Sequence, residues 1–234
     1  MTKSAHDPGT YNKNTAEYEY FLNEMMGRFP EGVLLSPEYA DWVQNNQLRF
    51  LIRLARYKFV AKLLKPTDQV LEVGSGSGLG SIFLGQHAFS VLGIDVKSTE
   101  VKDAIRLNQR ANVEFRKADL FELEQTASYD AVVSLDVIEH LTVEDGAKLL
   151  EAQTRLLKPG GMLIIGTPSI WSYPHQSPIS QSSHIQCYDL PDLVELAEKY
   201  VTRTISFSMN DEVVHTGYHK MAWYYFVVGF GPKV

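Results

Sequence analysis

Short apolar runs alternate with helical patterns through the middle of this 234-residue chain. The runs lie at residues 70–73, 90–94, 113–115, 129–135 and 162–166. Segments with helical character separate them and begin near Leu79, Ser98 and Thr142, and the last two are candidate N-caps. Alternation of short strands with helices is typical of βαβ units, so the pattern predicts a doubly wound, mostly parallel sheet of the α/β class.

Helical patterns also precede this core. A long amphipathic helix that ends before Pro66 is predicted by apolar positions at helical spacing, which are Leu48, Leu51, Ile52, Ala55, Phe59 and Leu63. Ser36 before Pro37 predicts the start of a shorter helix, and residues 15–26 predict another. We divide the chain into an N-terminal cap or lid, residues 1–46, and a main domain, residues 47–234.

A long polar segment follows the fifth apolar run. Residues 167–188 hold three prolines, several serines and a few aromatic side chains. A loop of this length inside a compact domain is usually functional or mobile. We therefore expect it to form a substrate loop that closes over the site together with the N-terminal residues.

The most informative motif is the glycine-rich turn at the end of the first apolar run. Gly74, Gly76 and Gly78 alternate through it, and glycine lets a ligand lie against the backbone. The dinucleotide fingerprint would need glycine at position 79, which is Leu79, so the spacing argues against NAD. Glu72 precedes the turn and favours a cationic ligand. S-adenosylmethionine, with its sulfonium and ammonium groups, fits this charge.

Carboxylates recur at the ends of the other apolar runs. Asp95 lies about twenty residues past the glycines, where a ribose-binding acid is found in Rossmann-type units. Asp119 and Asp136 follow the third and fourth runs. Because ligands bind at the carboxyl edge of open α/β sheets, these side chains predict one shared binding site.

The chain resembles the class I S-adenosylmethionine-dependent methyltransferases. The matching motifs are residues 72–78, 93–95, 118–120, 136–141 and 156–161, in the family's order. Residues 136–141, Asp-Val-Ile-Glu-His-Leu, are similar to the branch that contains the ubiquinone-biosynthesis O-methyltransferases and many small-molecule methyltransferases. The resemblance implies a seven-stranded Rossmann-like sheet that closes with an antiparallel hairpin, formed around a turn near Asn210.

The resemblance also implies roles for particular residues. Glu72 and the glycine turn would flank the methionine moiety of the cofactor, Asp95 would bind the ribose, and Asp119 would contact the adenine. Arg56 would lie near the cofactor carboxylate; the alternative is a surface arginine. The full cofactor-binding set is Glu72, Gly74, Ser75, Gly76, Gly78, Asp95, Val96, Asp119, Leu120, Asp136 and Arg56.

Asp136, Glu139 and His140 form an Asp-x-x-Glu-His pattern after the fourth run. With the downstream His184, these residues could hold a divalent ion, as the similar Glu-x-x-Glu-His pattern does in some relatives. Asp136 has a shorter reach than glutamate, and we favour a site without metal. His140 or His184 is then the candidate catalytic base, because imidazole titrates near neutral pH.

Composition narrows the functional class. A net charge of −6 argues against general nucleic-acid binding. Arg49, Arg53 and Arg56 recur at helical spacing, and we interpret them as a solvated helix face in preference to a basic stripe. One cysteine and the absence of a signal pattern or a long apolar run favour a cytoplasmic protein without membrane binding.

The predicted function is methyl transfer from S-adenosylmethionine to an oxygen or nitrogen of a small-molecule acceptor. One alternative is a metal-assisted RNA 2′-O-methyltransferase. Another is a regulator that binds the cofactor without catalysis. The oligomeric state is left open.

Overall fold

The computed structural model describes residues 16–233. The chain divides into two units, Met1–Leu34 and Leu35–Val234. The described part of the first unit contains helix α1 (Ala16–Arg28). Helix α2 (Pro37–Asn45) belongs to the second unit, although the sequence places it in the N-terminal segment. It packs there because Tyr39 and Trp42 are buried and Ser77 Oγ donates to Ser36 Oγ at 3.0 Å. Residues 1–15 lie outside the described residues, and closure of a lid stays a prediction.

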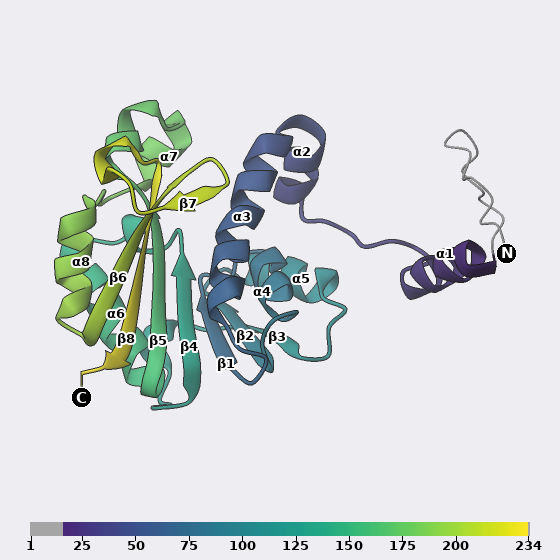
Figure 1. Ribbon diagram of the computed structural model, residues 1–234, viewed down its shortest axis with the longest axis horizontal. Helices are drawn as coiled ribbons and strands as arrows, with labels where there is room; N and C mark the ends of the chain where they lie inside the picture. Colours follow the sequence, from purple (N-terminus) through teal and green to yellow (C-terminus); the bar gives the residue numbers. More distant parts are fainter. Residues whose placement is uncertain (1–15, 234) are drawn as a thin grey trace, which may run out of the picture. The chain divides into compact units, whose positions relative to one another are not determined.

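The second unit is built on one sheet of eight strands (Figure 1). The strands are β1 (Gln69–Val73), β2 (Ser90–Asp95), β3 (Val113–Lys117), β4 (Tyr129–Leu135), β5 (Leu157–Pro168), β6 (Val201–Asn210), β7 (Val213–His215) and β8 (Tyr224–Pro232). Their order is β3-β2-β1-β4-β5-β8-β6-β7. The first five are parallel, and β8 pairs antiparallel with β5 and β6. The α/β class is confirmed.

The predicted count of seven strands is wrong by one. After β6 the chain turns back at Asp211, whose backbone φ of 49° lies in the left-handed region. The following residues, β7, then pair with Ser208–Asn210 at the outer edge of the sheet. The hairpin predicted around this turn is therefore the β6–β7 pair, in which β7 is a short strand at the outer edge of the sheet. The strand that joins β6 to the parallel part of the sheet is β8.

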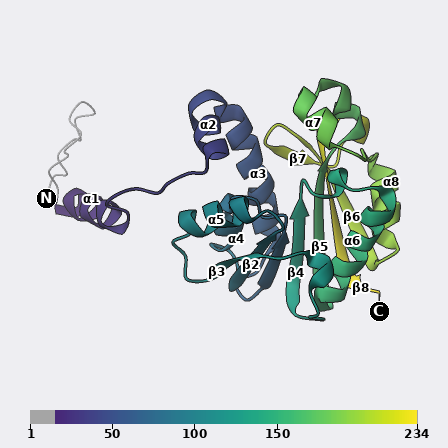
Figure 2. The ribbon, with the colours of Figure 1, turned by 180° about the vertical axis from the view of Figure 1, so that it is seen from behind.

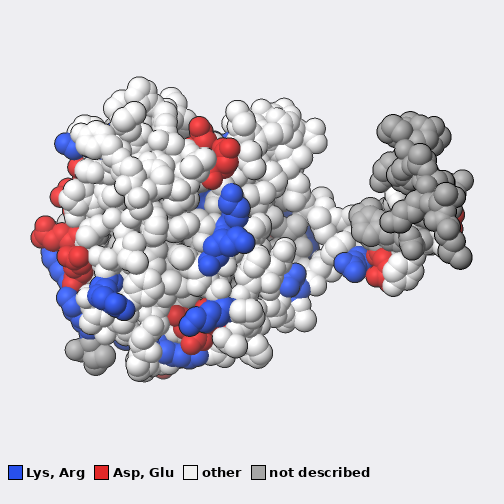
Figure 3. All heavy atoms as spheres, viewed as in Figure 1, with Lys and Arg blue, Asp and Glu red and all other residues white. Residues whose placement is uncertain are grey.

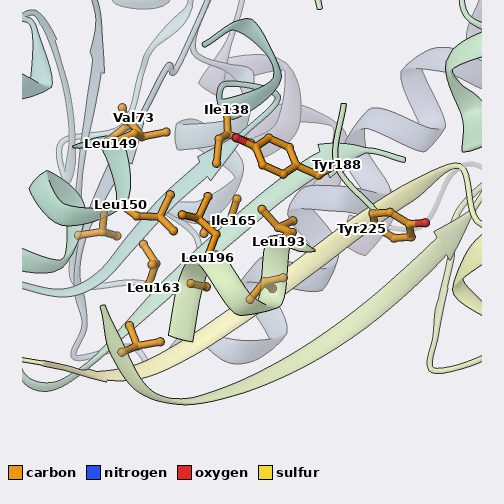
Figure 4. Close-up of a cluster of buried hydrophobic side chains, with 14 of the residues drawn as sticks. Val73, Ile138, Leu149, Leu150, Leu163, Ile165, Tyr188, Leu193, Leu196 and Tyr225 are labelled. Atoms are coloured by element: carbon orange, nitrogen blue, oxygen red, sulfur yellow. The ribbon is translucent and has the colours of Figure 1, made fainter. Parts of the chain in front are cut away.

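Helices cover both faces of the sheet (Figure 2). One face carries α3 (Gln47–Leu63), α4 (Leu79–Leu84) and α5 (Ser98–Leu107). The other carries α6 (Val143–Leu156) and α8 (Leu190–Glu198), whose leucines fill the core drawn in Figure 4. Two separate cores result, because successive strand side chains point to opposite faces.

Helix starts follow local chemistry in most places. Thr142 caps α6 by accepting from the Asp145 amide at 3.1 Å, as the sequence predicts. Ser98 is the first residue of α5 and not its cap; Lys97 occupies the cap position without a side-chain bond. No helix within residues 16–233 combines the length and the apolar character that crossing a bilayer requires.

The segment 167–188 has its own structure. It contains a 3₁₀ helix, η3 (Ile170–His175), and a short α-helix, α7 (Pro178–Ser183). The segment is anchored at both ends, because Ser169 forms a β-bridge with Tyr188 and the Ile170 amide donates to the Tyr188 carbonyl at 3.0 Å. Three further 3₁₀ turns are η1 (Leu120–Glu122), η2 (Ile138–His140) and η4 (His219–Met221).

Candidate active site

A cavity of about 760 Å³ opens at the carboxyl ends of the central strands. Its walls come from α2 and α3, the glycine turn, the β2–α5 connection, η2, the η3–α7 segment and the β6–β8 region. Among the predicted site residues, those that line it are Gly76, Asp95, Asp136, Glu139, His140, His184 and Arg56. This is the edge at which parallel α/β sheets bind ligands.

The glycine turn has the backbone that its sequence requires. Gly74, Gly76 and Gly78 all have positive φ, at 74°, 52° and 90°. A Cβ at Gly78 would lie 2.6 Å from the Ala104 Cβ, so this glycine lets α5 approach the turn. A Cβ at Gly76 would meet only one atom, at 4.0 Å. The backbone at Gly76 therefore faces open space in which a ligand fits.

Asp95 is fixed beside this turn. Its Oδ2 accepts from the Gly76 amide at 3.0 Å, and its Oδ1 accepts from the Lys97 amide at 2.8 Å. The carboxylate keeps further lone pairs for a ligand hydroxyl. Asp119 instead caps η1 by accepting from the Phe121 amide at 3.0 Å, and it does not line the cavity.

The remaining members of the predicted cofactor set do not line the cavity either. Leu120 and Ser75 are buried, whereas Val96 is exposed beside β2. Their contact with a cofactor stays a prediction.

Glu72 faces the interior and not the cavity. It is buried, accepts from Tyr57 Oη at 2.7 Å and also accepts from Ser81 Oγ. Burial raises the pKa of Glu72 to about 7. Glu72 does not line the cavity, and direct attraction of a cationic ligand by its charge stays a prediction. Glu72 instead ties α3, β1 and α4 together behind the glycine turn.

Arg53 and Arg56 of α3 share one carboxylate, that of Asp136. Arg56 Nη1 donates to both oxygens, at 2.8 and 2.7 Å, and Arg53 donates to Oδ2. The Arg56 guanidinium also lies 3.8 Å from the centre of the Tyr224 ring. Burial opposes ionisation of Asp136, but Arg56 and then Arg53 hold its pKa below the usual value. The interpretation as a solvated face is wrong for Arg53 and Arg56, because Asp136 meets them only in the folded chain, whereas Arg49 is exposed.

A second cluster lies beside this pair, on η2 and at the end of α7. Ligand atoms of Glu139, His140 and His184 all lie within 4.8 Å of one another, and Asp136 is outside the group. The Thr167 hydroxyl donates to Glu139 Oε2 at 3.0 Å, but Glu139 Oε1 is buried with no partner among the described residues. Burial and the nearby Asp136 raise the pKa of Glu139 to about 8.

The two histidines of this cluster differ in their surroundings. His140 Nδ1 lies 2.8 Å from the Ser183 carbonyl, so this nitrogen carries the proton. His184 Nδ1 is buried and has no partner among the described residues. Burial and then His140 lower the pKa of His184, so its imidazole is neutral near pH 7. The rings are 5.1 Å apart, edge to face.

The outer wall of the cavity comes from segments that are distant in sequence. His175 of η3 packs on Trp223, with ring centres 5.7 Å apart, and both line the cavity. Trp42 and Arg49 line it from α2 and α3. Trp42, His175 and Trp223 could not be assigned to the site from the sequence, because no local pattern distinguishes them from aromatic residues of the core.

His215 and His219 do not line the cavity. His215 accepts from the Gly217 amide at 2.9 Å, and His219 lies 3.3 Å from the Asp189 carboxylate. Neither is therefore positioned to act on a bound acceptor in this structure.

Residues 71–165 match a family described as "Methyltransferase domain". The chain is 36% identical over 105 residues to a ubiquinone biosynthesis O-methyltransferase from Leptothrix cholodnii. The match covers 42% of this chain and 43% of that protein, so the chain spans less than half the length of this relative.

Two solved structures share the fold. A SAM-dependent methyltransferase from Thermotoga maritima has a TM-score of 0.65 at 18% identity, covering 89% of this chain and 99% of that one. The N-methyltransferase NodS from Bradyrhizobium japonicum, solved with S-adenosylhomocysteine, has a TM-score of 0.60 at 15% identity. It covers 78% of this chain and 88% of its own.

Proposed function

We propose that this protein, which carries a class I methyltransferase domain in residues 71–165, transfers the methyl group of S-adenosylmethionine to a small molecule. The attacking atom is an oxygen or a nitrogen of the acceptor. The observation that carries the proposal is the pairing of Gly76 and Asp95 at the open edge of the sheet, beside a deep cavity. A cofactor and an acceptor can meet there.

The cofactor occupies the glycine-turn side of the cavity. Asp95 has lone pairs free for the ribose hydroxyls, and the Gly76 backbone has room for the methionine moiety. Arg56 lies at the same edge and supplies a cation for the cofactor carboxylate. Asp119 and Leu120 belong to the adenine end of the site.

The acceptor occupies the side formed by η2, α7 and Trp223. Methyl transfer forms a bond from the acceptor oxygen or nitrogen to the methyl carbon and breaks the bond from that carbon to sulfur. The site must align these three atoms and exclude water. His184 is the better placed base, because its Nδ1 is unpartnered whereas His140 donates to Ser183. A proton leaving the acceptor would go to the imidazole of His184.

Glu139, His140 and His184 also fit a divalent ion, since they offer one carboxylate and two imidazoles within 4.8 Å. Such an ion would lower the pKa of the attacking hydroxyl. We favour transfer without metal, because Asp136, one of the four predicted ligands, is engaged by two arginines and lies outside the cluster. Chelator should then leave turnover unchanged, and stoichiometric metal with chelator-sensitive turnover would contradict this choice.

The acidic composition disfavours the alternative of an RNA 2′-O-methyltransferase. The cluster of Glu139, His140 and His184 beside the cavity disfavours the alternative of a regulator without catalysis. A cytoplasmic location without membrane or general nucleic-acid binding remains part of the proposal.

Calorimetry with S-adenosylmethionine, S-adenosylhomocysteine and NAD tests the cofactor, and binding of NAD in preference to the methyl donor would refute it. A radiolabelled methyl donor incubated with metabolite extract tests the transfer. Methylation of RNA alone would favour the alternative enzyme, and cofactor binding without any transfer would favour the regulator.

A further inference from the structure

Three arginines of α3 line the cavity, one above the other. Arg49, Arg53 and Arg56 follow the i, i+4, i+7 spacing of one helix face, and each guanidinium lies over an aromatic ring. The ring under Arg49 is that of the buried Trp42, 4.7 Å away. Stacking of this kind fixes the plane of a guanidinium while its N–H edge stays free.

These three cations are matched by one carboxylate. Asp136 pairs with Arg53 and Arg56. Among residues 16–233 no carboxylate forms an ion pair with Arg49, although Glu38 and Asp211 also line the cavity. Within residues 16–233, Arg49 is therefore the arginine of this wall that has no ion-pair partner. The proposed function assigns the cofactor carboxylate to Arg56, so Arg49 stays available for an anion of another ligand.

The position of Arg49 points to the acceptor as the source of that anion. At 1.5 Å per residue, Arg49 lies roughly 10 Å along α3 from Arg56, towards the outer end of the cavity. The wall formed by residues 167–188 contains no Asp, Glu, Lys or Arg, and Figure 3 shows the uncharged surface over α7 at the upper left. That wall supplies no competing carboxylate for Arg49.

We infer that Arg49 binds an anionic group, a carboxylate or a phosphate, of the methyl acceptor. The inference rests on the proposed function and names its acceptor class: a small anionic molecule with a nucleophilic hydroxyl or amine. The anion lies on Arg49 and the nucleophile lies beside His184. Arg49 is exposed in the free protein, so its fork of N–H donors is open to an anion that enters the cavity.

Two matched probes test this assignment, 4-hydroxyphenylacetate and its neutral amide, 4-hydroxyphenylacetamide. Binding of each is measured by calorimetry to protein saturated with S-adenosylhomocysteine. The acid should bind about tenfold more tightly than the amide, because a bidentate arginine–carboxylate contact is a strong hydrogen bond. Inorganic phosphate should compete with the acid and not with the amide.

Variants then locate the effect. Arg49→Gln should remove the preference for the acid, and Arg49→Lys should retain part of it because the charge remains but the fork of donors is lost. Arg203→Gln is the control, because Arg203 is exposed on β6 and does not line the cavity. Binding of S-adenosylhomocysteine should be the same in all of these variants.

Equal affinity for acid and amide, failure of both to bind at millimolar concentration, or a preference that survives Arg49→Gln would overturn the inference. A stronger preference for the acid in Glu38→Gln or Asp211→Asn would show that Arg49 pairs within the chain, because removing its partner frees the guanidinium, and this also contradicts the inference. Failure to bind S-adenosylhomocysteine would instead refute the proposed function.

Discussion

The two sides of the cavity are built in different ways. On the cofactor side, Gly76 and Asp95 belong to adjacent strand ends, and both Asp95 oxygens accept backbone N–H groups. On the acceptor side, Arg49, His184 and Trp223 come from three segments far apart in the chain. There, Glu139 Oε1 and His184 Nδ1 have no partner among the described residues.

This difference shows where each side is specified. A ligand that contacts backbone and strand-end carboxylates can be recognised by a short motif, because the backbone of parallel strands places those groups. An acceptor is recognised by side chains whose neighbours are set by helix packing. Unpaired polar atoms carry a cost in stability, so they are expected where a ligand completes the site.

The largest effect is expected at Asp136, where the two sides meet. Asp136→Ala leaves the half-buried Arg53 and Arg56 without their counter-ion and should lower the free energy of unfolding by about 3–4 kcal/mol. Because the pKa of Asp136 is lowered, its contribution is present at neutral pH and is lost as the pH falls below about 4. Urea denaturation across this pH range measures the loss of stability and its dependence on pH.

Asp145→Ala, at an exposed ion pair with Lys148, is the control and should leave the urea midpoint nearly unchanged. Equal stability of the two variants would contradict the prediction.

A slightly smaller effect is expected at Gly78, on the cofactor side. Gly78→Ala places a Cβ 2.6 Å from the Ala104 Cβ at a φ of 90° and should cost about 3 kcal/mol of stability. Gly76→Ala meets only one atom, at 4.0 Å, and should cost about 1 kcal/mol from its positive φ alone. Urea midpoints compare the two. If both variants lost the same stability, the close approach of α5 would not be what requires Gly78.

On the acceptor side, Glu139→Gln should stabilise the protein at high pH. Glu139 ionises near 4.5 when unfolded, but in the folded protein its pKa is about 8. Stability is therefore lost as the pH rises from 4.5 to 8, because only the unfolded chain releases the proton. Glutamine cannot ionise, so the variant should match wild type at pH 4.5 and become progressively more stable than wild type as the pH rises to 8. A difference that does not change with pH would show that Glu139 is ionised in the folded state.

The smallest of these effects concerns Asp95 and the cofactor alone. Asp95→Ala should weaken binding of S-adenosylhomocysteine about tenfold, roughly 1.4 kcal/mol, because the ribose hydroxyls lose a charged acceptor. Asp119→Ala should have a weaker effect, since Asp119 caps η1 and does not line the cavity. Calorimetry measures the affinity of each variant for S-adenosylhomocysteine. An unchanged affinity in Asp95→Ala would show that Asp95 is not part of the cofactor site.

The sequence predicted the features that depend on neighbouring residues. Alternating apolar runs indicated the parallel sheet, and the positions of Gly74, Gly76 and Gly78 indicated a turn that requires positive φ. Asp95 could be placed because a strand end fixes its backbone. The Thr142 cap followed from a hydroxyl three residues before a free amide.

The tertiary structure alone decided how distant side chains pair. Whether Asp136 binds a metal or an arginine depends on the packing of α3 against β4, since Arg53 and Asp136 are 83 positions apart. Glu72 looks like a ligand-facing acid in the sequence, yet Tyr57 and Ser81 turn it inward. Backbone geometry is set by the residue itself and its neighbours, whereas the partner of a charged side chain is set by whichever charge the whole fold brings to it.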